Sequence, residues 1–237
     1  MNRKKTGFFA AWAVVIMFLA AVTLCIQALQ APQAVFSEAD VSMTIVLDAG
    51  HGGMDGGVVG RSTGVKESDL NLAITLKLKT ELEELGFDVV LTRKTEAGLY
   101  DAATKGFKRR DMQKRKEIIQ KAAPSMVISV HQNYYPSAST RGAQVFYNRK
   151  SEKGKKLAIS LQGQLNALYE TEKVKSRNVM AGEYFMLDCC DAPSAIVECG
   201  FLSSAKDETL LLNEAWQKKL AERITAGVMA YFSDNVS

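Results

Sequence analysis

The chain has 237 residues but only two histidines, four prolines and four cysteines. Cys25 lies in an apolar N-terminal run, which leaves Cys189, Cys190 and Cys199 in the remainder of the chain. An odd number of cysteines cannot all pair, so the sequence excludes the disulfide framework of a small secreted domain. A structural zinc site is disfavoured because no C-x-x-C spacing occurs. We expect buried free thiols, with a bridge from Cys189 or Cys190 to Cys199 as the alternative.

Internal repeats and low-complexity tracts are also absent, so the sequence predicts no array of appended binding modules. The net charge is only +4, but the segment 105–121 holds eight basic residues against two acidic ones. That local excess favours an anionic polymer or surface as a partner, with a solvated helix face as the alternative. No aromatic interleaving accompanies these charges, and we therefore expect no nucleic-acid partner.

Residues 1–30 are predicted to form a signal-anchor. A basic cluster at residues 3–5 precedes a nearly unbroken apolar run at residues 7–26. Twenty residues at helical rise cover roughly 30 Å, which is enough to cross a bilayer and exceeds the about 7–15 residues of a secretory h-region. The basic cluster favours a cytoplasmic N-terminus, so the rest of the chain is expected outside the membrane. Cleavage within residues 31–34, which would release the protein, is the alternative.

The remainder reads as a linker at residues 31–43 and one folded domain at residues 44–233, in which strands and helices alternate. The first strand, the helix from Leu70 to Leu85 and the second strand form a β-α-β unit, which predicts parallel pairing with a right-handed crossover. Helices are expected at residues 70–85, 110–122, 157–168 and 216–231, where apolar residues recur every three or four positions. Apolar runs predict strands at residues 44–48, 87–93, 126–130, 143–147, 184–187 and 195–201. Residues 97–107 and 171–182 are expected to be irregular.

Both histidines directly follow apolar strands. His51 lies in the glycine-rich turn Gly50-His51-Gly52-Gly53, and His131 follows the strand at residues 126–130. The carboxyl ends of parallel strands meet at one edge of a sheet, so both imidazoles are expected to reach the same crevice. Neutral imidazoles suit Zn²⁺, and catalytic zinc takes three protein ligands and leaves a fourth position for water. The sequence therefore predicts a shared zinc site, although one such histidine alone would more often be structural.

Two carboxylates are candidates for the remaining roles. Glu67 begins the first helix, across the glycine-rich turn, and is the candidate third ligand; stabilisation of the helix N-terminus is the alternative. Glu198 lies in an apolar strand, where a carboxylate costs several kcal/mol unless it is paired or functional, and where burial raises its pKa. We predict that Glu198 takes a proton from activated water and later gives it to the leaving nitrogen. The alternative is a buried ion pair with Arg93 or Arg115.

The glycine-rich turn also comes close to a dinucleotide-binding fingerprint. Residues 50–55 follow a strand as the G-x-G-x-x-G motif does, but Asp55 occupies the place of the third glycine. The helical periodicity starts well after the motif, and a nucleotide site would leave His131 and Glu198 without a role. We therefore rank a dinucleotide site below a zinc site.

With these residues in place, the chain resembles the zinc-dependent N-acetylmuramoyl-L-alanine amidases, a family that includes bacterial cell-separation and spore-cortex enzymes. Ala49 stands where the family often has proline, and Cys199 stands beside Glu198 where an aliphatic residue is usual, which makes redox sensitivity an open question. The stretch 104–110 is similar to the germination-specific, spore-cortex branch. The matching segments are Asp48-Ala49-Gly50-His51-Gly52-Gly53, Asp55-Gly56-Gly57, Glu67 with Asn71, Thr92-Arg93, Arg115, Ser129-Val130-His131-Gln132-Asn133 and Val197-Glu198-Cys199-Gly200-Phe201-Leu202.

The resemblance implies an α/β fold with a mixed, mostly parallel sheet of about six strands flanked by helices, in a single zinc amidase catalytic domain. It implies Zn²⁺ ligands at His51, Glu67 and His131 and a catalytic carboxylate at Glu198. Four further residues are expected to bind substrate or to support the ligands, namely Asp48, Arg93, Arg115 and Asn133.

The implied reaction is hydrolysis of the amide between N-acetylmuramic acid and L-alanine in peptidoglycan. In the spore-cortex branch this prepares muramic δ-lactam formation by a separate deacetylase. The alternatives are a zinc hydrolase of another amide and a catalytically silent wall-binding module. The expected partners are peptidoglycan, the membrane through the N-terminal segment, and an accessory lipoprotein or other protein.

Overall fold

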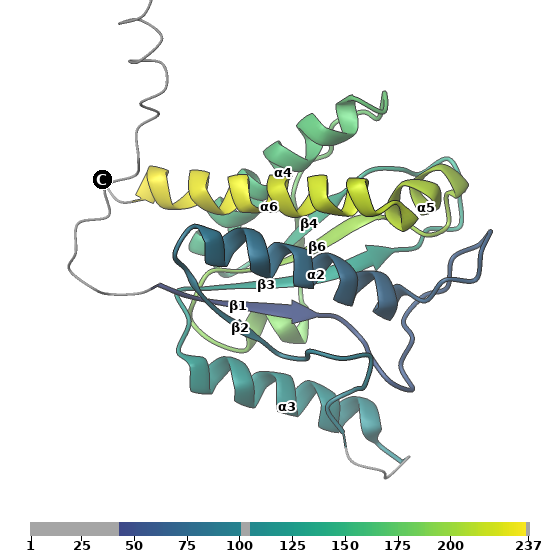
Figure 1. Cartoon of the computed structure of the whole chain (residues 1–237). Coiled ribbons are helices and arrows are strands. Elements are labelled where there is room, and N and C mark those ends of the chain that lie inside the picture. The colour runs from purple at the N-terminus through teal and green to yellow at the C-terminus, as the bar shows by residue number, and fades with distance from the viewer. Residues whose placement is uncertain (1–42, 101–104, 236–237) are drawn as a thin grey trace, which may run out of the picture. The chain divides into compact units, whose positions relative to one another are not determined.

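A six-stranded sheet with helices on both faces makes up the part of the chain that a computed structural model describes, residues 43–100 and 105–235 (Figure 1). The predicted signal-anchor and nearly all of the predicted linker fall in residues 1–42, outside the described residues. In the described part of the chain, no helix is long and apolar enough to cross a membrane.

The sheet has the strand order β2-β1-β3-β6-β4-β5. Neighbouring strands run parallel except β4 and β6, which are antiparallel. The predicted mixed, mostly parallel sheet of about six strands is therefore confirmed. The strands are β1 (Thr44–Ala49), β2 (Asp88–Leu91), β3 (Met126–Asn133), β4 (Gln144–Asn148), β5 (Met180–Gly182) and β6 (Ser194–Phe201).

Helices cover both faces of this sheet, which explains why β1, β3 and β6 are almost uninterrupted apolar runs. Figure 1 shows α2, α4 and α6 on one face and α3 on the other. Alternate residues of a strand point to opposite faces, so Leu47 packs in the core under α2, α4 and α6, and Val46 packs with Ile119 of α3. The helices are α2 (Glu67–Glu84), α3 (Phe107–Ala122), α4 (Glu152–Glu170), α5 (Ala205–Leu212), α6 (Glu214–Asn235) and the short 3₁₀ helix η1 (Phe185–Asp188).

Four local predictions need correction. The strand expected at residues 184–187 is wrong, because η1 forms there and buries Met186 and Leu187 on the α3 face of the sheet. A run of four apolar residues does not distinguish a strand from a turn of helix. Strand β5 lies in a segment expected to be irregular, α5 was not expected, and α3 begins at Phe107 rather than near residue 110.

The cysteines follow the main expectation. Cys189, Cys190 and Cys199 are free thiols, and Cys189 and Cys199 are buried. The alternative of a bridge to Cys199 is therefore wrong. Burial raises the pKa of the Cys199 thiol well above its usual range, which keeps it protonated beside Glu198.

Candidate metal centre and its crevice

Three predicted ligands lie together at the carboxyl edge of the sheet. His51 directly follows β1, Glu67 is the first residue of α2, and His131 lies near the end of β3. The nitrogen and oxygen atoms they offer are all within 4.8 Å of one another. Glu67 Oε1 is 3.3 Å from His51 Nε2 and 2.9 Å from His131 Nδ1. Two imidazoles and one carboxylate are a donor set that suits catalytic zinc and leaves a fourth position open.

Two glycines make this close approach possible. A Cβ added at Gly50 would lie 2.2 Å from ring atoms of His131, and one at Gly57 would lie 2.4 Å from Glu67 Oε2. Real Cβ atoms do not approach other atoms this closely, so both positions require glycine, which has no side chain. His51 itself adopts a left-handed backbone with φ of 62°, which turns the chain sharply after β1.

Glu67 is buried and held by several donors. Its Oε1 accepts hydrogen bonds from the Gln132 backbone N–H and from Asn71 Nδ2, both at 3.2 Å, and its Oε2 accepts one from the Val58 N–H at 2.9 Å. Burial raises the pKa of Glu67, but the His131 and His51 side chains lower it by more than burial raises it. The net pKa of Glu67 therefore lies well below its usual range. The carboxylate is therefore ionised, as a metal ligand must be.

The other nitrogen of His51 is also occupied. His51 Nδ1 lies 3.1 Å from Asp55 Oδ2, and Lys108 Nζ lies 3.2 Å from Asp55 Oδ1. Burial lowers the pKa of His51, but Glu67 and Asp55 raise it more, so the net shift is upward. A carboxylate on the far nitrogen of an imidazole fixes the ring orientation. Sequence reasoning gave Asp55 no role of its own, although its presence in the glycine-rich turn was a usable signal.

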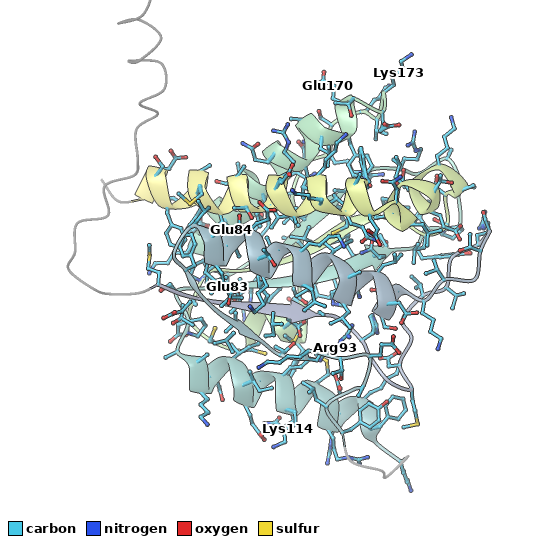
Figure 2. All side chains as sticks on the ribbon, in the orientation of Figure 1. Glu83, Glu84, Arg93, Lys114, Glu170 and Lys173 are labelled. Atoms are coloured by element: carbon cyan, nitrogen blue, oxygen red, sulfur yellow. The ribbon has the colours of Figure 1, made fainter. Side chains whose placement is uncertain are left out.

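Beneath the turn lies a buried charged network. Arg115 donates to the backbone oxygens of His51 at 2.5 Å and Ala49 at 2.7 Å, and Arg93 donates to those of Ala49 at 2.8 Å and Gly50 at 3.1 Å. Figure 2 labels Arg93 beside the end of β1. Asp48 pairs with Arg115 and accepts hydrogen bonds from Ser129 and Thr92. These contacts hold the backbone that carries His51.

The charge of Asp48 is fixed by the same network. Burial raises the pKa of Asp48, but the Arg115 guanidinium and the hydroxyl donors lower it by more than burial raises it. The net pKa of Asp48 is about 2. The guanidinium groups of Arg93 and Arg115, which bind backbone oxygens of the turn, and the ionised Asp48 therefore lie directly under His51. They give this predicted ligand rigid support.

Glu198 lies in β6 opposite His131 of β3 in the strand register. Its residue is partly exposed, but its Oε2 is buried and has no hydrogen-bond partner among the described residues. Burial raises the pKa of Glu198 to about 7, although the nearby His131 and His51 act against that rise. Arg93 and Arg115 make their bonds elsewhere, so the ion pair considered as an alternative does not form.

Asn133 is the one predicted site residue whose contacts point away from the ligand group. Its side-chain oxygen accepts a hydrogen bond from the Tyr134 N–H at 2.8 Å, and its backbone oxygen accepts one from the Leu202 N–H at 2.8 Å. These bonds terminate β3 and tie it to the segment after β6. A role of Asn133 in substrate binding stays a prediction.

A hollow of about 200 Å³ opens beside His51 and His131, between α3 and η1. Sequence reasoning gave no role at the site to the side chains that form its outer wall, which come from the loop end and basic helix at residues 107–112 and from the misassigned segment at residues 184–187. These residues are Phe107, Lys108 and Met112 from the first part of α3, and Tyr184, Phe185 and Met186 from η1 and the residue before it.

Comparison with known proteins agrees with this geometry. Residues 45–230 match a family model described as N-acetylmuramoyl-L-alanine amidase. A germination-specific N-acetylmuramoyl-L-alanine amidase of Bacillus subtilis is 35% identical over 193 residues, which cover 80% of each chain. The AmiA amidase of Escherichia coli is 29% identical over 232 residues, covering 79% of this chain and 75% of that one.

Solved structures give the same result. The CwlD amidase of Clostridioides difficile, determined in complex with the GerS lipoprotein, superposes with a TM-score of 0.78. It is 36% identical, and the match covers 81% of this chain and 100% of that one. A second amidase, from Clostridium difficile 630, gives a TM-score of 0.72 at 27% identity, covering 83% of this chain and all of the other.

Proposed function

Because the chain belongs to the N-acetylmuramoyl-L-alanine amidase family, we propose that it hydrolyses the bond between N-acetylmuramic acid and L-alanine with the help of Zn²⁺. The ion is held by His51, Glu67 and His131. The observation that carries this proposal is the convergence of three ligand atoms within 4.8 Å at the carboxyl edge of the sheet. The family accounts for the amide specificity, and the ligand group accounts for the metal.

The residues fit zinc in three respects. The donor set is two imidazole nitrogens and one ionised carboxylate oxygen. Gly50 and Gly57 have no side chain that would collide with His131 and Glu67. Asp55 orients His51, and Asn71 orients Glu67. When bound, Zn²⁺ supplies Lewis-acid activation of water and polarisation of the scissile carbonyl.

Glu198 carries the proton in this proposal. Its buried Oε2 has no other partner among the described residues, and a pKa of about 7 allows both gain and loss of a proton near neutrality. The carboxylate takes a proton from the attacking water and gives it to the amide nitrogen of L-alanine, which leaves as a neutral amine. Arg115 and Arg93 act indirectly, because they hold the turn that bears His51.

The test is mass spectrometry of purified sacculi digested by the full-length chain, with and without zinc. We expect released stem peptides that begin with a free L-alanine amine, together with unsubstituted muramic acid in the glycan. Products cut at any other bond favour the alternative of a zinc hydrolase of another amide. Binding to sacculi without any product favours the silent wall-binding module.

A role in spore-cortex maturation is the finer part of the proposal. It is supported by the similarity to the germination-specific enzyme of Bacillus subtilis. In the cortex, removal of the stem peptide prepares muramic acid for conversion to muramic δ-lactam by a separate deacetylase. Deletion of the gene should leave cortex peptidoglycan without muramic δ-lactam; an unchanged δ-lactam content would assign the enzyme to the vegetative wall.

The proposed location is outside the cytoplasm, with residues 1–30 as a signal-anchor, residues 31–43 as a linker and residues 44–233 as the catalytic domain. The N-terminal apolar run supports an anchor, and the wall substrate supports the location. Membrane fractionation followed by N-terminal sequencing tests both, since a mature N-terminus near residue 31 would indicate a cleaved signal. A protein partner is also proposed, because the similar CwlD amidase was solved with a lipoprotein.

A further inference from the structure

A second hollow borders the one beside the ligand group. The first, of about 200 Å³, reaches from His51 and His131 to Tyr184 and Phe185. The second, of about 350 Å³, is lined by the same two aromatic residues and by more cations than carboxylates, namely Lys116, Arg149 and Lys150 against Glu183 and Asp188. We call these two neighbouring hollows, which share Tyr184 and Phe185 in their lining, the α3–η1 groove.

One face of α3 forms the wall of this groove. Lys108, Met112 and Lys116 are spaced four residues apart, so their side chains lie above one another on the same side of the helix. Lys108 Nζ is anchored 3.2 Å from Asp55, next to the ligand group. Lys116 Nζ lies 5.8 Å from the centre of the Phe185 ring. Two positive charges thus stand about 12 Å apart along the helix axis, with apolar side chains between them.

This pattern suits an acidic peptide better than a glycan. Sugar rings of peptidoglycan offer hydroxyl and N-acetyl groups, which give an ammonium no charge to pair with. The stem peptide begins with the small side chain of L-alanine and continues with a residue whose carboxylate is free unless it has been amidated. That carboxylate lies about 6 Å from the scissile nitrogen, within reach of Lys108, and later carboxylates of an extended chain reach Lys116.

We propose that the α3–η1 groove is the stem-peptide subsite and that Lys108 and Lys116 select peptides with free carboxylates. This inference rests on the proposed amidase function and deepens it. Lys108 has three donor hydrogens, so it can keep its contact with Asp55 while it binds a substrate carboxylate. The Lys108 side chain is 66% exposed, so water screens this pairing and its contribution is that of a surface ion pair.

The test uses the full-length chain and short synthetic glycan chains whose muramic acid carries L-alanine followed by D-isoglutamate or by its carboxamide. We expect the wild type to prefer the free acid by about two- to fivefold in kcat/KM, mainly through KM, as an exposed ion pair allows. Lys108→Ala should remove the preference, because kcat/KM on the free acid should fall further than kcat/KM on the carboxamide, which the loss of the contact with Asp55 lowers as well. Lys108→Arg, which restores the charge, should restore the preference. For Lys116→Ala the loss should appear only with longer peptides that carry a further carboxylate.

Lys114→Ala is the matched control on the same helix. Lys114 extends away from the sheet in Figure 2, pairs with Glu117 at 2.8 Å and does not line the groove, so the preference should persist. Equal cleavage of acid and carboxamide by the wild type would overturn the inference, as would an equal loss on both substrates in Lys108→Ala. Failure of the proposed function looks different, because then the wild type would cleave neither substrate.

Discussion

One oxygen of Glu67 faces both imidazoles, and this governs which nitrogen each histidine presents. His51 points Nε2 at Oε1 and uses Nδ1 for Asp55, whereas His131 points Nδ1 at the same oxygen. The two rings meet edge to face at an interplanar angle of 78°. This difference arises because His51 lies on a left-handed turn and His131 on an extended strand. An asparagine or glutamine at either position would therefore not reproduce both the reach and the direction of the donor.

Glu198→Gln tests the proton carrier. The amide is nearly isosteric but cannot take a proton from water, so we expect kcat on peptidoglycan to fall by about 10²- to 10⁴-fold. Zinc content, measured by atomic emission on the purified variant, should stay equal to that of the wild type because Glu198 is not among the proposed ligands. Near-normal turnover at full zinc occupancy would show that another group moves the proton.

Asp48→Asn tests the buried network beneath the turn. The folded-state pKa of Asp48 is lowered from 3.8 to about 2, so its contribution to stability is fully present above pH 4 and is lost as the pH falls towards 2. The shift corresponds to about 2 kcal/mol. The variant removes one of the two carboxylates that pair with Arg115 and leaves Asp111 as the other, so above pH 4 we expect a loss of about 2–3 kcal/mol in unfolding free energy.

The measurement is urea unfolding of metal-free protein between pH 2 and pH 7. In Asp48→Asn the dependence of stability on pH below 4 should be flatter than in the wild type. Asp191→Asn, a change at an exposed aspartate outside the network, should leave the wild-type slope intact. An unchanged slope in Asp48→Asn would mean that other carboxylates cause the acid sensitivity.

At the scale of elements, the glycine-rich turn brings His51 close to His131 only because β1 and β3 are neighbouring strands. Gly50→Ala introduces a Cβ 2.2 Å from the His131 ring, which must then move out of the ligand group. We expect zinc affinity to fall by about 10- to 100-fold, the range seen when a ligand loses its support. Competition with a chromophoric chelator measures the affinity directly.

Gly163→Ala provides the comparison. Gly163 lies on an exposed side of α4, and a Cβ there meets no atom within 4 Å. The substitution should raise stability by about 0.5–1 kcal/mol, because glycine is unfavourable inside a helix, and should leave zinc affinity unchanged. If Gly50→Ala bound zinc as tightly as Gly163→Ala, the close packing of Gly50 against His131 would not matter for the ligand group.

The alternation of elements explains what the sequence could predict. His51 and His131 were predicted as ligands because strand ends in a parallel sheet converge, and Glu67 because it begins the first helix across the turn. Glu198 was predicted as the proton carrier because a carboxylate in an apolar strand is costly unless it is paired or functional. The strand at residues 184–187 was wrong because four apolar residues carry no distinguishing period. The role of Asp55 was missed because only the fold of the turn brings its carboxylate to the far side of the imidazole.

Two groups of residues show the limit of local pattern more generally. Lys108 belonged to a basic segment predicted to meet an anionic polymer or surface, or alternatively to form a solvated helix face, and only the position of η1 shows that its side of α3 borders a hollow. Arg93 and Arg115 were identified by resemblance, but their bonds to three consecutive carbonyl oxygens depend on a turn that no periodicity describes. These hydrogen bonds join residues that lie about 40 to 65 positions apart in the sequence. They depend on how the elements pack, and the order of residue types along the chain does not specify that packing.

At the scale of the whole molecule, the proposed ligands come from the turn after β1, the start of α2 and the end of β3, so one ion would link three segments. An ion that binds the folded chain and not the unfolded one stabilises it by about 2.7 kcal/mol when free metal is 100 times Kd. For a domain of this size each kcal/mol raises Tm by about 2–4 °C, so calorimetry should show a rise of about 5–10 °C when zinc replaces a chelator. His131→Ala should lose this rise, and Glu198→Gln should keep it. A full rise in His131→Ala would remove His131 from the ligand set, because stabilisation by the ion would then not require its imidazole.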